Sequence, residues 1–338
     1  ARPMRAAIYP GNGGPVTIET LADPRPGPGE VLIRVSRCGI CGTDLAMTRG
    51  GAWDYGSGVQ FGHEYAGEIV ELGREVSALR VGDRIAVMPS LACGRCTSCR
   101  AHGNAVLCED KQGSAMLGFS ELAAIPQGAA TKLPAVLSLA DGALIEPLAI
   151  SLYGVQLAAI RPGDSVLVLG AGSVALYAVY WARRLGAGRI AVMSRSPRRA
   201  ALARDMGADR FIAFGENEAG DLREALGGAP VVVLECVGAQ GMLMKALSHV
   251  APFGRILSLG FCTAPDPVIP ALGSYKCASI QFSVGYSMRE FLYIADQIDK
   301  GHVDPKRTIS STVTLDELPA TLAMLRKPNA ETKVHVTF

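Results

Sequence analysis

The chain has 338 residues, of which 49% are hydrophobic and 19% charged, and it contains 39 glycines. This composition excludes a disordered chain and leaves room for about two domains. The formal net charge of +2 argues against a broad surface for nucleic acid or an acidic membrane, and no apolar run is long enough to span a bilayer. We therefore expect neither nucleic acid nor a membrane among its partners.

The start of the chain lacks the charged segment and apolar core of a secretory signal, so we expect a cytoplasmic protein. Nine cysteines are present, and six of them fall within residues 38–41 and 93–108. Without a secretory signal, this grouping favours metal binding over disulfide bonds.

The first part of the chain alternates short strand-like runs with loops rich in proline and glycine. Several short strands without regular helices between them are typical of a barrel-like β domain. The predicted strands are Arg5–Tyr9, Val31–Ser36, Glu64–Leu72 and Arg84–Val87.

After about Pro147 strands and helices alternate, which predicts a parallel, doubly wound sheet. A helix over Arg289–Asp299 and a strand over Lys333–Phe338 then return to the first domain. The strands of the sheet are predicted over Val166–Leu169, Ile190–Met193, Val231–Leu234, Ile256–Leu259 and Ile280–Val284, and its first helices over Ser173–Leu185 and Pro197–Met206.

Four cysteines, Cys93, Cys96, Cys99 and Cys108, form the densest motif. The C-x-x-C interval lets two thiolates reach one ion, and four thiolates make a closed, tetrahedral, structural zinc site. Free buried thiols are the plain alternative, and repeated C-x-x-C spacing argues against them. A zinc-finger interaction module also fits the block alone, but a finger needs no long α/β domain.

Gly170, Gly172, Ser173 and Val174 belong to a run that matches G-x-G-x-x-A. The first glycine permits a tight turn, and the second lets a pyrophosphate approach the backbone at a helix N-terminus. Such matches are common in a glycine-rich chain, but this one follows a predicted strand and opens a helix, as a dinucleotide site requires.

Cofactor choice depends on the end of the next strand, where a carboxylate would bind the ribose of NAD. This chain has Ser194 and Arg195 there, with Arg199 following. The arginine fork can bind a 2′-phosphate, so we expect NADP(H) over a possible NAD(H). A surface arginine that merely precedes a helix is the alternative. Val237, which follows a later strand, is expected beside the nicotinamide.

Three further motifs complete the pattern: Cys41-Gly42-Thr43-Asp44, Gly62-His63-Glu64 and Glu146-Pro147-Leu148. In this order, with the cysteine block between the second and the third, they resemble the zinc-containing medium-chain dehydrogenase/reductase family. The resemblance covers essentially the whole chain and is nearest to the branch of sorbitol-type and threonine dehydrogenases.

That resemblance implies an α/β protein with two domains. A GroES-like β-barrel catalytic domain would comprise residues 1–147 and 285–338, with a structural zinc lobe over 90–110. A Rossmann coenzyme domain would comprise residues 148–284. The resemblance also implies a homodimer or homotetramer, two zinc ions in each chain, and a nicotinamide cofactor.

The resemblance assigns the catalytic zinc to Cys41, His63 and Glu146. Glu64 would bind zinc directly or through water, and Asp44 would orient His63. Three protein ligands leave a position for an alcohol or ketone oxygen, which zinc polarises. The expected reaction is therefore hydride transfer between the nicotinamide and a secondary alcohol, a polyol or its ketone.

Thr43 matches the family's hydroxyl that takes the alcohol proton toward the cofactor ribose. Many relatives continue this relay with a histidine three residues later, where this chain has Ala46. The relay must therefore end in water or another group, or be slower. A second departure is the eight-residue segment Arg100–Leu107, one longer than is usual, which a loop tolerates easily.

Two other functions fit parts of the sequence. A zinc-free quinone or enoyl reductase would need no ligand set, so Cys41, His63 and Glu146 count against it. A non-catalytic, zinc-stabilised nucleotide-binding protein is disfavoured by the same residues and by Thr43, although Ala46 keeps it open.

Overall fold

The structure is a computed structural model that describes residues 3–111 and 113–338. It divides the chain into two compact units. Unit 1 holds the chain up to Glu146, together with Tyr286–Lys300 and Ile309–Phe338, and unit 2 holds Pro147–Gly285 and Gly301–Thr308. The functional assignment of these stretches to a catalytic and a coenzyme domain stays a prediction.

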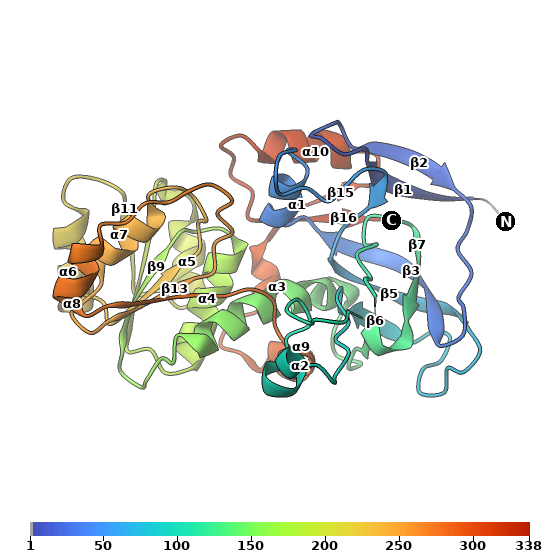
Figure 1. The fold of residues 1–338 in the computed structure, drawn as a ribbon, viewed down its shortest axis with the longest axis horizontal. Coiled ribbons are helices and arrows are strands. Elements are labelled where there is room, and N and C mark those ends of the chain that lie inside the picture. Colours follow the sequence, from blue (N-terminus) through green and yellow to red (C-terminus); the bar gives the residue numbers. More distant parts are fainter. Residues whose placement is uncertain (1–2, 112) are drawn as a thin grey trace. The chain divides into compact units, whose positions relative to one another are not determined.

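Unit 1 is built mainly of β-strands (Figure 1). Its strands are β1 (Met4–Tyr9), β2 (Thr17–Leu21), β3 (Glu30–Gly39), β4 (Val59–Gln60), β5 (Glu64–Leu72), β6 (Arg84–Val87), β7 (Leu122–Pro126), β8 (Ala130–Lys132), β15 (Ile309–Thr314) and β16 (Lys333–Thr337). Its helices are α1 (Gly42–Met47), α2 (Thr97–His102), α9 (Met288–Gln297) and α10 (Leu318–Leu325), while α3 (Leu139–Leu157) begins in unit 1.

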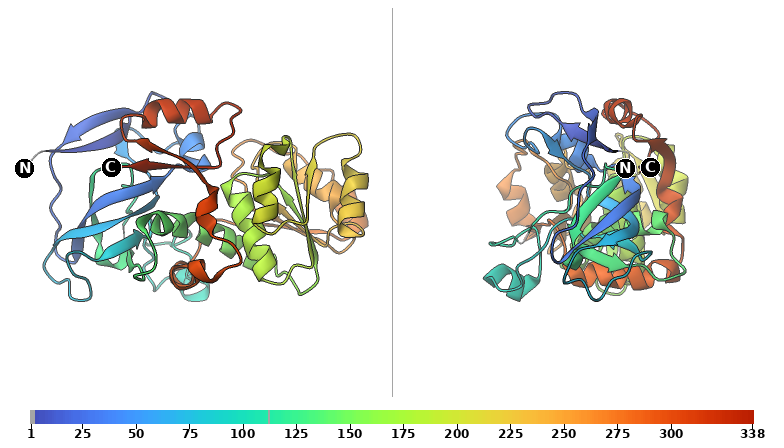
Figure 2. Two further views of the ribbon diagram at one scale, coloured as in Figure 1. Left: turned by 180° about the vertical axis from the view of Figure 1, so that it is seen from behind. Right: turned by 90° about the vertical axis from the view of Figure 1, so that its right-hand side faces the viewer.

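The strands of unit 1 form two sheets. Three strands have the order β2-β1-β4, and seven follow the order β15-β16-β3-β5-β6-β8 with β7 beside β3. β5 pairs along one edge of β3, from Val31 to Gly39. β7 and β16 share the other edge, with β16 opposite Arg37–Gly39. Figure 2 shows the red C-terminal strand among blue strands from the start of the chain.

The core of unit 1 follows from alternation along the central strand. Val31, Ile33 and Val35 of β3 are buried and belong to one apolar cluster. Ile69 of β5 and Ile85 of β6 join the same cluster. β-Branched residues dominate it because they pack well on a pleated sheet.

Unit 2 contains the predicted parallel sheet. Its strands are β9 (Ser165–Leu169), β10 (Arg189–Ser194), β11 (Arg210–Ala213), β12 (Val232–Glu235), β13 (Arg255–Ser258) and β14 (Ser279–Phe282). Its helices are α4 (Ser173–Arg184), α5 (Ala200–Asp205), α6 (Glu218–Leu226), α7 (Met242–His249) and α8 (Pro270–Lys276), and they flank the strands in Figure 1.

All neighbours in this sheet are parallel, in the order β11-β10-β9-β12-β13-β14. Numbered by appearance within the unit, this is 3-2-1-4-5-6, the order of a dinucleotide-binding Rossmann sheet. The strand order reverses between β9 and β12, and ligands of such sheets bind at the carboxyl ends of the strands near this point.

Helix α3 contains the motif Glu146-Pro147-Leu148. It runs through Pro147 and ends at Leu157. Proline has no N–H, so the helix loses one internal hydrogen bond there. Among the described residues, no helix is both long and apolar enough to cross a membrane.

A lysine caps the end of α7. The Lys276 ammonium donates to the carbonyl oxygens of Leu247, Ser248 and Val250 at 2.8, 2.7 and 2.8 Å. These carbonyls lie at the helix C-terminus, where a cation is also favoured by the helix dipole. Burial lowers the pKa of Lys276, but three carbonyl acceptors favour its charged form.

We predict that Lys276→Met lowers the free energy of unfolding by about 1–2 kcal/mol, because three carbonyls lose a charged donor. Urea unfolding of purified protein measures this change. Lys327→Met, at an exposed lysine in unit 1, is the control and should change stability by less than about 0.5 kcal/mol. Equal losses in the two variants would contradict the capping role.

Candidate functional site

The sulfurs of the four-cysteine cluster, Cys93, Cys96, Cys99 and Cys108, all lie within 4.8 Å of one another. The Cys93 and Cys99 sulfurs are 3.9 Å apart. In a tetrahedron with Zn–S bonds of about 2.3 Å, the sulfurs are about 3.8 Å apart. The cluster therefore has the size and the donor chemistry of a structural zinc site.

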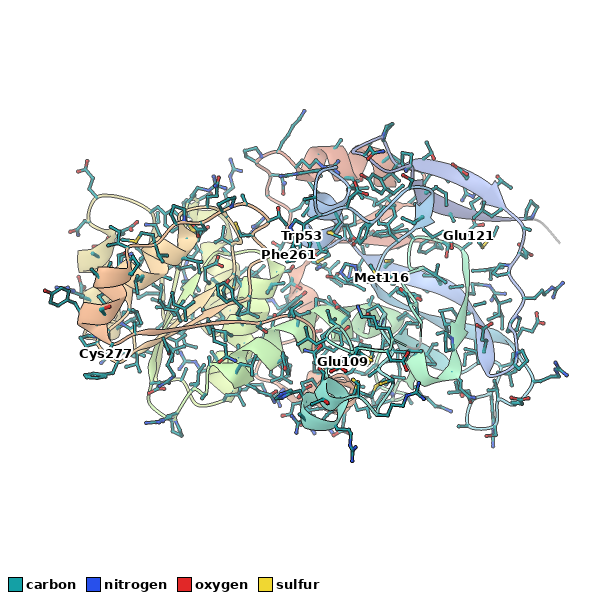
Figure 3. All side chains as sticks on the ribbon, in the orientation of Figure 1. Trp53, Glu109, Met116, Glu121, Phe261 and Cys277 are labelled. Carbon is teal, nitrogen blue, oxygen red and sulfur yellow. The ribbon has the colours of Figure 1, made fainter. Side chains whose placement is uncertain are left out.

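Backbone amides stabilise charge on this cluster. The N–H groups of Cys96, Cys99 and Cys93 donate to the sulfurs of Cys93, Cys96 and Cys108 at 3.3, 3.4 and 3.3 Å. The Glu109 amide lowers the pKa of Cys96, and the Cys93 amide lowers that of Cys108. Burial raises the pKa of Cys99 to about 12, so a cation is needed to hold all four as thiolates. Figure 3 labels Glu109 beside α2.

A second group of donors consists of Cys41, His63 and Glu64, whose ligand atoms also lie within 4.8 Å of one another. Cys41 follows β3 as the N-cap of α1, and Glu64 opens β5 directly opposite Gly39. The antiparallel register of β3 and β5 therefore brings two distant segments together. A thiol, an imidazole and a carboxylate within this distance fit a zinc ion.

The Asp44 carboxylate contacts two members of this group, Cys41 and His63. Its carboxylate accepts the Cys41 N–H at 2.9 Å and the Tyr55 hydroxyl at 2.8 Å. His63 Nδ1 lies 3.4 Å from the same carboxylate, a contact too long or too bent for a good hydrogen bond. With Nδ1 facing Asp44, Nε2 is the ring nitrogen left for a metal. Burial lowers the pKa of His63, but Asp44 and Cys41 together outweigh it and the net shift is upward.

Glu146, the predicted third ligand, is buried but does not belong to the group of donors within 4.8 Å. Its Oε1 accepts the hydroxyl of Tyr286 at 3.0 Å. Burial raises the pKa of Glu146 to about 7, with the Glu64 charge adding to the rise and His63 opposing it. A bound cation would favour the ionised carboxylate. Its role as a ligand stays a prediction.

Lys333 is a residue of this centre that the sequence reasoning missed. Its ammonium lies 2.8 and 2.6 Å from the two oxygens of Glu64 and donates to the Ile40 carbonyl at 3.1 Å. The two side chains are 1% and 0% exposed. Gly39 makes room for Glu64, because a Cβ there would lie 2.2 Å from Glu64 Oε2. No spacing rule links position 333 to position 64, since only the sheet joins them.

Thr43 and Ala46 lie on α1, half-buried. The Thr43 amide donates to the Cys41 sulfur at 3.4 Å. The hydroxyl expected to begin the proton relay is thus on the second residue after the N-cap cysteine. The roles expected for both positions stay predictions.

The glycine-rich turn follows β9 as expected. Gly170 has a φ of 106°, which favours glycine, and a Cβ there would meet Val237 Cγ2 at 3.0 Å. Gly172 is the N-cap of α4, and a Cβ there would meet nothing within 4 Å. Ser173 and Val174 form the half-buried first turn of the helix. This open N-terminus fits an anionic group.

Arginines flank the same turn. Ser194 ends β10 half-buried, and Arg195 after it is exposed. Arg199 is half-buried, and its guanidinium donates to the Ala171 carbonyl within the glycine-rich turn at 3.2 Å. Arg195 is therefore the freely placed guanidinium at the end of this strand, while Arg199 contacts the turn.

The sequence reasoning also missed Glu235, at the end of β12. Its buried carboxylate accepts the N–H groups of Val237 and Gly238 at 2.7 and 2.9 Å, and the Ser258 hydroxyl at 3.0 Å. A carboxylate with three donors fixes the backbone of this loop at the switch point. Val237 itself is 39% exposed.

Comparison with known proteins bears on both units. Residues 27–135 match the family described as alcohol dehydrogenase GroES-like domain, and residues 173–299 match the family described as zinc-binding dehydrogenase. Sorbitol dehydrogenase of Bacillus subtilis (strain 168) is 35% identical over 266 residues, covering 76% of this chain and 75% of that protein.

Solved structures match along the entire length. A protein from Sinorhizobium meliloti 1021, described as a zinc-binding dehydrogenase and bound to NADP, has a TM-score of 0.89 and 30% identity, with 100% of both chains covered. An alcohol dehydrogenase from Escherichia coli CFT073 complexed with NADH has a TM-score of 0.90 and 27% identity, again with 100% of both chains covered.

We predict that Lys333→Met lowers the free energy of unfolding by about 3–5 kcal/mol, because it leaves the Glu64 charge buried without a partner. Adding Glu64→Gln to this variant should restore part of the loss, since a neutral amide is less costly to bury. Urea unfolding at matched zinc content measures both.

The control is Lys300→Met, whose partner Asp296 is 67% exposed. This exposed pair should contribute less than about 0.5 kcal/mol. If Lys333→Met lowered the free energy of unfolding by no more than the control does, the structural importance of the buried pair would be contradicted.

Proposed function

The chain belongs to the zinc-containing medium-chain dehydrogenase/reductase family of alcohol dehydrogenases, and we propose that it transfers a hydride between NADP(H) and a secondary alcohol, a polyol or the corresponding ketone. The expected fold, a GroES-like domain with a Rossmann-type parallel sheet, is confirmed. The chain is therefore an NAD(P)-dependent zinc alcohol dehydrogenase. The observation that carries the proposal is the convergence of Cys41, His63 and Glu64.

The catalytic centre would use Cys41, His63 and Glu146 as protein ligands. When bound, zinc polarises an alcohol or ketone oxygen, and the nicotinamide exchanges the hydride. Asp44 orients the imidazole from behind, and Lys333 holds both oxygens of Glu64, which would bind zinc directly or through water. The four cysteines of the cluster would hold a second, structural zinc.

Proton transfer would begin at Thr43, whose hydroxyl takes the alcohol proton toward the cofactor ribose. Ala46 offers no group to pass the proton on, so we propose that water receives it. The preference for NADP(H) is supported by Ser194 and the exposed Arg195, since a guanidinium pairs with a 2′-phosphate that a carboxylate would repel.

The substrate class is supported by the relative that acts on sorbitol, a polyol. A zinc-free reductase or a non-catalytic nucleotide-binding protein would have no use for the grouped donors Cys41, His63 and Glu64. Both of these alternatives predict fewer zinc ions in each chain than the proposal does. The number of zinc ions bound to each chain therefore distinguishes the proposal from the alternatives.

We further propose a homo-oligomer joined through the edge strand β14. Its outer edge has no neighbour among the described strands, and Phe282 at its end is 67% exposed. Tyr275 and Ile269, on or beside the preceding helix, are 91% and 59% exposed. An exposed, apolar edge favours pairing with a second copy of the chain.

Arg195→Ala should raise the NADP⁺ Michaelis constant about 10- to 100-fold, because the lost charged hydrogen bonds contribute about 1.5–3 kcal/mol. The constant for NAD⁺ should change less than about threefold. Reduced-nicotinamide absorbance measures both with the same alcohol. Arg198→Ala is the control at an exposed neighbouring arginine. An equal effect on both cofactors would refute the assignment.

We predict two zinc ions in each chain, and one after Cys41→Ser, with at least about a 10³-fold loss of turnover. Elemental analysis gives the count, and a panel of secondary alcohols, polyols and ketones gives the turnover. Cys236→Ser is the control, because this cysteine lies in unit 2 outside both clusters. The proposal would be overturned if Cys41→Ser kept two zinc ions, or if the fully metallated protein showed no turnover of any compound in the panel.

A further inference from the structure

Two neighbouring residues of unit 1, Tyr286 and Ser287, contact Glu146, the predicted ligand of the catalytic zinc, and the loop of the four-cysteine cluster. The Tyr286 hydroxyl donates to Glu146 Oε1 at 3.0 Å. Ser287 forms an isolated antiparallel β-bridge with Asn104, which lies between the third and fourth cysteines of the cluster. The two centres are therefore joined by a short path through one dipeptide.

On the cluster's side, this path begins at a tightly turned backbone. The Gly103 N–H donates to the Cys99 carbonyl at 2.8 Å and ends α2 with a φ of 66°. Asn104 follows fully buried, and its Oδ1 accepts the Val106 N–H at 3.0 Å. The Cys108 N–H then donates to the Ala105 carbonyl at 3.3 Å. Gly103 and Asn104 are thus held by hydrogen bonds to other residues of the segment Cys99–Cys108.

At the junction, little space separates the two segments. A Cβ on Gly103 would lie 3.3 Å from the Ser287 Cβ, closer than most real Cβ contacts. Ser287 is buried, as is Asn104 across the bridge. A displacement of the turn at Gly103 would therefore be passed to Ser287, because dense packing transmits strain.

Ser287 is fixed on its other side by a capping box. Its N–H donates to Glu290 Oε2 at 2.9 Å, and its hydroxyl bonds the same oxygen. The Arg289 N–H donates to the Ser287 hydroxyl at 3.2 Å. Tyr286 precedes this anchored residue and stacks on Phe291 at a centroid distance of 6.0 Å. The Tyr286 ring thus has little freedom to move on its own.

We propose that the four-cysteine cluster, beyond stabilising its own loop, positions Glu146 through Ser287 and the Tyr286 hydroxyl. Tyr286 is a positioning residue in this scheme, since its hydroxyl fixes one carboxylate oxygen and thereby the direction of the other. The inference rests on the proposed function, in which Glu146 is a ligand of the catalytic zinc. Hydrogen-bond partners of metal ligands typically change metal affinity 10- to 100-fold when removed.

The first test is Tyr286→Phe, which removes the hydroxyl and keeps the stacked ring. In the full chain, the dissociation constant of the catalytic zinc should rise about 10- to 100-fold in competition with a chromophoric chelator. Visible bands of Co²⁺ at that centre should also shift. Tyr9→Phe is the control, because its hydroxyl donates to Asp54, which belongs to neither donor group. An unchanged affinity and spectrum in Tyr286→Phe would overturn the positioning role.

The second test addresses the path from the cluster. Gly103→Ala places a Cβ against Ser287, whereas Gly82→Ala, in unit 1 outside both donor groups and with a φ of 90°, meets nothing within 4 Å. Both variants carry similar backbone strain. Only Gly103→Ala should shift the Co²⁺ spectrum and weaken the catalytic metal, by about threefold or more. The same behaviour in both variants would overturn the path.

The metal count of Cys41→Ser separates this inference from the function on which it rests. The inference alone is overturned if Cys41→Ser loses one zinc ion while Tyr286→Phe keeps the zinc affinity and the Co²⁺ spectrum of the unchanged protein. Retention of both zinc ions in Cys41→Ser overturns the assignment of the catalytic centre, and the inference with it.

Discussion

The register of β3 against β5 is the constraint on which the candidate catalytic centre depends. Gly39 lies opposite Glu64, so the residues just past the end of β3 meet those just before the start of β5. Side chains alternate along a strand, and a slip of one residue would turn Glu64 to the other face. Two irregularities interrupt this register, between Leu32 and Ile33 and between Val35 and Arg37, so the pairing of Gly39 with Glu64 depends on both.

The same strand explains the buried lysine. β16 pairs with the end of β3 on the edge away from β5, with His335 opposite Gly39. Lys333, two residues earlier, reaches across the space that Gly39 leaves open. A buried ion pair adds little to stability over apolar residues of the same shape, but each partner is costly to leave alone. The pair thus ties the last strand to the metal centre.

The features that were predicted from the sequence are those contained in short stretches of the chain. Closely spaced cysteines, the turn at Gly170 and the apolar runs of β9 and β12 are each contained in a few residues, and the structure has a compact sulfur cluster and a parallel sheet there. Asp44 beside His63 was expected from resemblance alone. Lys333 and Glu235 were missed, because each joins its site through tertiary pairing that no spacing reveals. Helix α3 was not predicted either.

The bond between Tyr286 and Glu146 also has a topological meaning. Glu146 is the last residue of unit 1 before the chain leaves it, and Tyr286 is the first on its return. Unit 1 thus presents two adjoining attachment points for the insertion Pro147–Gly285, besides those of the shorter excursion Gly301–Thr308. The entropy of closing so long a loop rises only with the logarithm of its length. The two ends of the long insertion are therefore held together at a cost that depends little on how many residues lie between them.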